Sequence, residues 1–236
     1  MRYVVYDAET RSVSSLKQTG SHIYLCDPVT DVVCVSYCVV VDGVRGPIST
    51  WLPLQPIPAE ILEAAADPDT LIVSFNDAFE RQLEQHILHP RYGWPIFPIE
   101  RRRCAQATAL THALPAALDA VAAALRLTVR KTPAGKRAMK QLAQPRKPRK
   151  GEDPSKTYWH DDPKLLATLY EYNRIDVAIT PRSWRGMASS QRKSKKSGNW
   201  MRQLTRAVFA AMWAYSMPQS ILLRSLPPIC ATGLRR

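Results

Sequence analysis

Two carboxylates, Asp7 and Glu9, directly follow the short apolar run of residues 3–6. In an extended strand, residues two positions apart project to the same side, so we expect both carboxylates side by side at the rim of a sheet. Carboxylates held that close repel each other unless a proton or a cation comes between them. A pair of oxygen ligands suits Mg²⁺ or Mn²⁺. The alternative is a solvated strand end.

Two more acidic residues belong to segments far along the chain. Glu80 follows the second apolar run, residues 71–75, at the start of a predicted helix. A later helix begins at Asp162, an N-cap residue followed by proline at the first helical position. One face of that helix carries, at spacings of four, three and four, the residues Leu165, Leu169, Tyr172 and Asp176. Asp176 is therefore an ionisable group at the end of an apolar stripe.

These four carboxylates predict one shared site. In α/β sheets, sites gather where the strands end, which is where the carboxylates after the two apolar runs would lie. Such a cluster can hold two divalent cations about 3.5–4 Å apart, which suits hydrolysis at phosphorus. Tyr172 lies one turn before Asp176 on the same helix face, so its hydroxyl could orient an attacking water.

The surrounding pattern predicts an α/β layered domain of three or four strands with interleaved helices. We expect strands at residues 2–7, 32–41, 48–52 and 71–75, with Asp42-Gly43 as a hairpin turn. Residues 12–30 are polar and turn-rich. Helices are predicted at residues 58–66, from 76 through 87, and at 104–113, 115–127, 133–143 and from 162 onward. The basic, proline-containing residues 145–157 form either a mobile connection or a flap that contacts phosphates.

Composition excludes several classes of protein. The five cysteines include no C-x-x-C pair, so neither a disulfide framework nor a zinc ribbon is predicted. The chain shows no signal peptide, and a reducing cytoplasm fits best. The spacing of the five histidines is not typical of metal ligands; they are His22, His86, His89, His112 and His160.

Three ordered segments, YDAETRS, NDAFE and YNRID, resemble the sequence blocks of the DEDD superfamily of 3'–5' exonucleases. More narrowly, residues 1–178 resemble the proofreading exonuclease domain of phage-type family A (DNA polymerase I-like) DNA polymerases. The stretches RYGWPIFPIERRRC and LPAALDAVAAALRL are similar to that subgroup as well. The resemblance implies an RNase H-like layered domain, in which helices flank a mixed central sheet.

The resemblance also implies roles for individual residues. The ligands of two divalent cations, Mg²⁺ or Mn²⁺, would be Asp7, Glu9, Glu80 and Asp176. Glu80 stands where the superfamily more often has aspartate, which puts the metal geometry in doubt. Tyr172 fits the tyrosine subclass of the third block, because Glu171 occupies the position where the other subclass has histidine. Asn76 and Phe79 are candidates for substrate binding, with Phe79 also suited to packing under the site.

The function implied is hydrolysis of the 3'-terminal phosphodiester bonds of single-stranded DNA, the proofreading reaction of a truncated DNA polymerase I-like protein. One alternative is a catalytically silent remnant that binds nucleic acid, and another is a ribonuclease D-like enzyme. The partner would be a nucleic-acid 3' end, with no membrane and no obligate protein partner. The location would be the cytoplasm of a bacterial host, with a phage or prophage origin.

Residues 179–236 do not continue the resemblance. They contain 11 Lys or Arg and no Asp or Glu; removing these 11 charges from the total of +13 leaves +2 for residues 1–178. We expect an irregular basic tail that is degenerate or frameshifted, with no polymerase domain, and with disorder through much of residues 181–206. The alternative is a basic nucleic-acid-binding arm at residues 192–206. The apolar run 207–217 is too short to span a bilayer.

Overall fold

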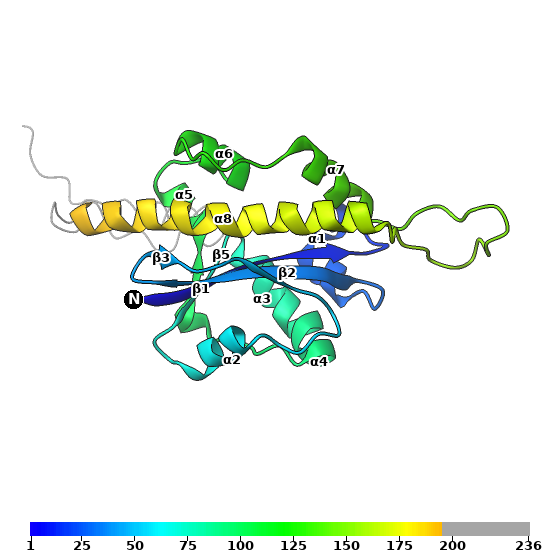
Figure 1. The fold of residues 1–236 in the computed structure, drawn as a ribbon, viewed down its shortest axis with the longest axis horizontal. Coiled ribbons are helices and arrows are strands. Elements are labelled where there is room, and N and C mark those ends of the chain that lie inside the picture. The colour runs from blue at the N-terminus through cyan, green and yellow to red at the C-terminus, as the bar shows by residue number, and fades with distance from the viewer. Residues whose placement is uncertain (195–236) are drawn as a thin grey trace, which may run out of the picture. The chain divides into compact units, whose positions relative to one another are not determined.

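The computed structural model describes residues 1–194, with side chains described for residues 1–181 and for Trp184. Its centre is one mixed sheet with helices on both faces (Figure 1). The strands are β1 (Arg2–Arg11), β2 (Asp31–Val41), β3 (Val44–Arg45), β4 (Ser49–Trp51), β5 (Leu71–Ser74) and β6 (Arg102–Cys104). The helices are α1 (Leu16–Cys26), α2 (Ala59–Ala66), α3 (Asp77–Leu83), η1 (Glu84–Leu88), α4 (His89–Tyr92), η2 (Ile99–Arg101), α5 (Ala105–Thr111), α6 (Leu118–Ala124), α7 (Pro133–Leu142) and α8 (Pro163–Ser194).

Strand β1 is the middle strand of the order β3-β2-β1-β5-β6, and β4 pairs with β2. It runs antiparallel to β2 and parallel to β5. The sheet is therefore mixed and flanked by helices, so the predicted layered α/β fold is confirmed. Because helices cover both of its faces, β1 is apolar at every position from residue 3 to residue 6, and all four side chains are buried.

Two hydrophobic clusters pack on the two faces of the sheet. Alternate β1 residues point to opposite faces, so Val4 and Tyr6 join one cluster while Tyr3 and Val5 join the other. The first cluster includes residues of α1, α2, α3 and η1. The second includes residues of α5, α6 and α8 (Figure 1). The layers thus fix which helices can reach the end of β1.

Most predicted elements are present. The turn at Asp42 and Gly43 has positive φ at both residues, 48° and 82°, as a tight hairpin between β2 and β3 requires. At the start of α8, Asp162 Oδ1 accepts a hydrogen bond from the backbone N–H of Lys164 at 2.8 Å, which confirms the predicted N-cap.

The prediction of a turn-rich segment at residues 12–30 was wrong for its middle, which forms α1. Gly20 has φ 76° inside this helix and kinks it. The kink interrupts the helical periodicity, which is why no regular apolar stripe signals a helix there. The short strand β6, just before α5, was also not predicted.

Helix α8 continues beyond the predicted domain boundary at residue 178. It passes through Pro181 and ends at Ser194, so residues 181–194 are helical where partial disorder was expected. Ile179 and Trp184 belong to a core cluster, and the Trp184 ring lies 4.9 Å from that of Tyr3. The frameshift origin of the tail stays a prediction, and the run at 207–217 and most of the predicted arm lie outside the described residues. Within the part of the chain that the structure describes, no helix combines the length and apolarity needed to cross a membrane.

Candidate metal centre

Three carboxylates from the two ends of the described chain meet at one point. Asp7 and Glu9 come from β1, and Asp176 comes from α8. One oxygen of each lies within 4.8 Å of the others. The predicted convergence of these three residues is therefore present.

The local structure of β1 explains how two of them come together. Asp7 and Glu9 share one side of the strand because they are two residues apart. The pairing of β1 with β2 shifts register between Glu9 and Thr10. Such irregularities bend a strand and change the direction in which its side chains point, and they are frequent beside active sites.

Asn173 attaches α8 to the sheet at this point. Its Nδ2 donates a hydrogen bond to Asp7 Oδ2 at 2.7 Å. Its Oδ1 accepts one from the backbone N–H of Ser36 on β2, also at 2.7 Å. Because Asn173 is fully buried, both bonds form away from water, and they determine where Asp176, one turn later, meets β1.

Glu80 approaches the cluster from α3. It lines the same pocket as Asp7 and Asp176, a cavity of about 440 Å³. Glu80 is only 4% exposed, and its Oε2 has no hydrogen-bond partner. Burial raises the pKa of Glu80 well above its usual range, and the charge of nearby Asp7 raises it further.

A buried ion network holds α3 in this position. Arg102 on β6 donates to Asp77 Oδ1 at 2.9 Å and to Glu84 Oε2 at 2.7 Å. It also donates to the hydroxyl of Tyr6 at 2.9 Å, and that hydroxyl in turn donates to Glu84. The network therefore joins β1, β6 and both ends of the helical segment that carries Glu80.

Asn76 and Phe79, the predicted substrate-binding residues, lie in different places. Asn76 is exposed and lines the 440 Å³ pocket. Phe79 is partly buried, packs against a core cluster, and lines a second pocket of about 290 Å³ that also includes Glu9. The two pockets thus each include one carboxylate of β1.

Tyr172 and Lys131 lie beside Asp176. Lys131 Nζ donates to Asp176 Oδ2 at 2.6 Å and to the Tyr172 hydroxyl at 3.2 Å. The ring of Tyr172 packs so closely on Gly135 of α7 that a Cβ there would lie 2.4 Å from its Cδ2. The tyrosine hydroxyl therefore has a fixed place near the carboxylates.

Burial and mutual repulsion raise the pKa values of the carboxyl groups. Burial, then the nearby Asp176 charge, raises the pKa of Asp7 to about 8. Burial, then Asp7 and Asp176, holds the pKa of Glu9 well above its usual range. Burial raises the pKa of Asp176 to about 6, even though Lys131 lowers it. Fully ionised, this cluster is unfavourable unless positive charge enters it.

The residues present fit divalent cations. All four donors are carboxylates, which is the ligand set of hard cations such as Mg²⁺ and Mn²⁺. Two buried oxygens, Oε2 of Glu80 and Oδ1 of Asp176, have no hydrogen-bond partner among the residues that the structure describes. Buried polar atoms without partners are rare in proteins, and a bound ion is one of the explanations for them.

Sequence reasoning did not find Asn173 or Lys131. Asn173 lies inside the YNRID segment, and an amide side chain directly after Tyr172 was a signal that sequence reasoning could have used. Lys131 lies in a loop before α7, and no local pattern marks it.

Comparison with known proteins gives one relative in sequence. No family model matches the chain. A DNA polymerase of Bacillus phage SP02 is 29% identical over 150 residues, which are 64% of this chain and 22% of that polymerase. The chain is thus similar to a phage DNA polymerase over that stretch, in line with the predicted resemblance, and it spans less than a quarter of that relative's length. It has the mixed α/β fold expected of a 3'–5' exonuclease domain.

Solved structures are similar to this chain at lower sequence identity. Brucella melitensis NrnC with bound Mg²⁺ has a TM-score of 0.47 at 14% identity, covering 92% of this chain and 89% of that one. Exonuclease X in complex with 5' overhanging duplex DNA has a TM-score of 0.32 at 16% identity, covering 56% of this chain and 77% of that one. With TM-scores below 0.5, these overlaps carry no weight for the site.

Proposed function

We propose that this chain is a metal-dependent 3'–5' exonuclease that hydrolyses the 3'-terminal phosphodiester bonds of single-stranded DNA. The observation that carries the proposal is the meeting of Asp7, Glu9 and Asp176 within 4.8 Å, with Glu80 on the same pocket. Oxygen clusters of this kind suit phosphoryl chemistry. The phage relative is a DNA polymerase, which supports DNA as the substrate and a phage or prophage origin.

We assign the binding of two divalent cations to the four carboxylates, Asp7, Glu9, Glu80 and Asp176. Mg²⁺ or Mn²⁺ bound there supplies a nucleophile from water at neutral pH and offsets charge on the phosphate. The protein's part is to hold the carboxylates close together in fixed positions. Asn173 does so for Asp7, and the Arg102 network does so for the helix that carries Glu80.

We assign the orientation of the attacking water to Tyr172. Its hydroxyl accepts a hydrogen bond from Lys131 and has its own proton free to donate. Because Gly135 leaves no space behind the ring, the hydroxyl keeps its direction. A fixed donor or acceptor beside the reacting water reduces the reorganisation needed in the transition state.

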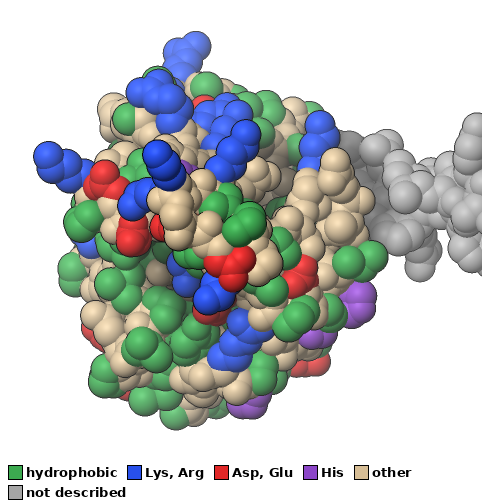
Figure 2. Space-filling model, turned by 90° about the vertical axis from the view of Figure 1, so that its right-hand side faces the viewer, with side chains coloured by type: hydrophobic (Ala, Val, Ile, Leu, Met, Phe, Trp, Pro, Cys, Tyr) green, Lys and Arg blue, Asp and Glu red, His purple; other side chains and the backbone are tan. Residues whose placement is uncertain are grey.

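We assign the substrate to the two pockets and their rim. A cavity of about 440 Å³ lies within the size range of small-ligand sites and includes Asn76 at an exposed position. Phe79 in the second pocket offers an aromatic ring against which a base can stack. The loop between α7 and α8 carries Lys147, Arg149 and Lys150 at exposed positions. Figure 2 views the molecule from the end that carries this loop, and Lys and Arg side chains gather in the upper half of that view. Positive side chains of this kind neutralise the phosphates of a nucleic-acid backbone.

The test uses purified full chain with 5'-labelled single-stranded DNA or RNA, in Mg²⁺, Mn²⁺ or EDTA. We expect stepwise shortening of DNA from the 3' end with either metal, none in EDTA, and none with Asp7→Ala. The matched control is Asp69→Ala, because Asp69 is an exposed aspartate outside the cluster.

Three results would overturn the proposal in different ways. Shortening of RNA with little effect on DNA would make the enzyme a ribonuclease of the alternative kind. Binding of either nucleic acid without shortening in any metal would make the chain a silent remnant. Retained activity in Asp7→Ala would remove the cluster from the reaction altogether.

A further inference from the structure

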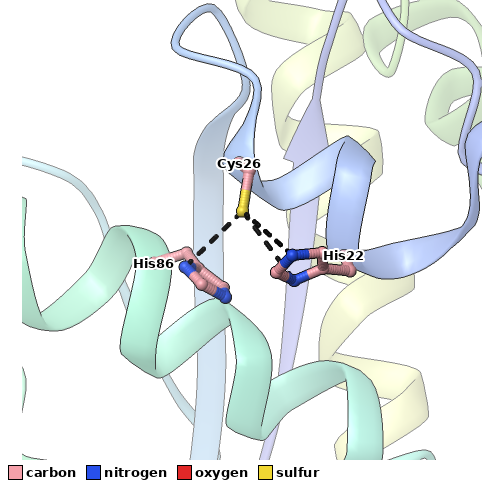
Figure 3. A group of neighbouring side chains, drawn as sticks. All are labelled: His22, Cys26 and His86. Carbon is pink, nitrogen blue, oxygen red and sulfur yellow. Dashed lines mark hydrogen bonds between the residues drawn. The ribbon is translucent and has the colours of Figure 1, made fainter.

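A second group of metal-binding side chains lies apart from the carboxylates. His22 and Cys26 come from α1 and His86 comes from η1, and Figure 3 shows the thiol between the two imidazoles. Cys26 Sγ lies 3.8 Å from His22 Nδ1 and 3.8 Å from His86 Nδ1. His22 and Cys26 are exposed and His86 is partly exposed, so ions in solution reach the group.

The distances match those between ligands of one tetrahedral ion. With zinc–sulfur and zinc–nitrogen bonds of about 2.3 and 2.05 Å, tetrahedral geometry puts a thiolate and an imidazole nitrogen about 3.6 Å apart. The observed separations of 3.8 Å are within a few tenths of an ångström of that value. His22 and Cys26 reach one point because residues four apart share a helix face.

Hydrogen bonds alone give the thiol and the two imidazoles only weak partners. A thiol is a weak donor and its sulfur a weak acceptor, so Cys26 can donate to one imidazole and accept from the other, but both bonds are weak. The two imidazole rings themselves meet edge to face, with centroids 5.4 Å apart. A cation placed between sulfur and both nitrogens would use all three groups at once.

We propose that His22, Cys26 and His86 bind one Zn²⁺ ion, with water as the fourth ligand. Thiolate and imidazole select a borderline-soft metal, whereas the all-carboxylate cluster selects Mg²⁺ or Mn²⁺. On binding, the Cys26 thiol releases its proton to solvent and the thiolate coordinates the ion. The ion joins α1 to η1. Nearby, Ser21 of α1 already donates a hydrogen bond of 3.2 Å to Gln82 of α3, the helix that η1 continues.

The chain connects this proposed zinc site to the carboxylate cluster. Helix α1 follows the strand that carries Glu9, and η1 continues the helix that carries Glu80. An ion that fixes these two elements to each other therefore stabilises the surroundings of both carboxylates without contacting them.

The test titrates reduced, metal-free full chain with Co²⁺ and follows the thiolate-to-cobalt charge-transfer absorption, which the carboxylate cluster cannot produce. We expect the band to saturate at one ion per chain and to disappear when Zn²⁺ displaces Co²⁺. Asp7→Ala and His160→Gln should keep the band. Cys26→Ser should lose it, and His86→Gln should weaken Zn²⁺ binding by more than about tenfold, the loss that even an outer partner of a metal ligand causes.

Thermal unfolding gives a second, independent readout. In the Asp7→Ala background, which disables the carboxylate cluster, Zn²⁺ should raise the Tm, and adding Cys26→Ser should abolish that rise, since an ion that binds the folded state stabilises it. Absence of a thiolate band would overturn the proposal. So would a band that persists in Cys26→Ser, or a Tm rise that persists in Asp7→Ala/Cys26→Ser. Because Asp7→Ala is inactive under the proposed function yet should keep the band, the two proposals fail separately.

Discussion

The ammonium nitrogen of Lys131 lies 2.6 Å from Oδ2 of Asp176, so the protein itself places a positive charge at the edge of its carboxylate cluster. That charge lowers the pKa of Asp176 against the effect of burial. In return, the neighbouring carboxylates raise the pKa of Lys131. Lys131 and a divalent cation therefore compete for the charge of the same carboxylate.

We predict that Lys131→Met raises the affinity for Mn²⁺ by about tenfold, because removing a competing charge near a protein surface is worth on the order of 1–2 kcal/mol. Isothermal titration calorimetry of the two proteins measures it. Lys136→Met is the matched control, since Lys136 is exposed on α7. Weaker Mn²⁺ binding in Lys131→Met would mean that the lysine supports the metal site.

We predict that Gly135→Ala lowers both stability and activity. The new Cβ would lie 2.4 Å from Cδ2 of Tyr172, so the ring must move. Overpacking of this kind costs about 1–3 kcal/mol in the free energy of unfolding, which urea denaturation measures. The double variant Gly135→Ala/Tyr172→Ala should recover part of the stability while remaining slow in DNA shortening. Wild-type activity in Gly135→Ala would show that the position of Tyr172 is unimportant.

We predict that Arg102→Met destabilises the fold by about 3–5 kcal/mol, because it removes the positive charge that Arg102 places beside the buried carboxylates of Glu84 and Asp77. Urea denaturation of the variant measures the loss. Adding Glu84→Gln to Arg102→Met should return part of it, since one uncompensated charge is removed. The control is Arg103→Met, because Arg103 is the exposed neighbour on β6 and bonds only to backbone carbonyls. Equal effects of the two arginine variants would contradict the role of the network.

We predict that the metal-free protein loses stability as pH rises from about 5 to 8. The folded state keeps the Asp7 proton up to a pKa of about 8, whereas the unfolded state releases it near the ordinary value of 3.8. Unfolding then releases a proton in this range, and rising pH favours it. Thermal unfolding in EDTA across this range measures the slope. Asp7→Asn should flatten it, and Mg²⁺ should offset the loss in the wild type. Stability that rises with pH in EDTA would contradict the shift.

Much of the carboxylate site could be predicted from local sequence. Asp7 and Glu9 lie together because a strand has a period of two, and a short run of residues contains all the information needed. The N-cap at Asp162 and the stripe ending in Asp176 likewise depend on neighbours within a few turns of one helix.

The residues that sequence reasoning missed depend on contacts between distant segments. The cluster at Cys26 needs His86, which lies on another helix, and α1 itself was hidden by the kink at Gly20. Lys131 reaches Asp176 from a loop with no pattern of its own. Helix α8 continues past residue 178, because the change in composition there does not coincide with a change in packing.

The sequence by itself determined most of the strands and helices and the three short segments that carry the acidic residues, because periodicity and capping are local properties. Only the tertiary structure decided that three carboxylates come within 4.8 Å, that a lysine joins them, and that a thiol lies between two imidazoles. The physical reason is that these encounters depend on how the sheet and its helices pack. Packing follows from the whole set of buried side chains and not from any one segment.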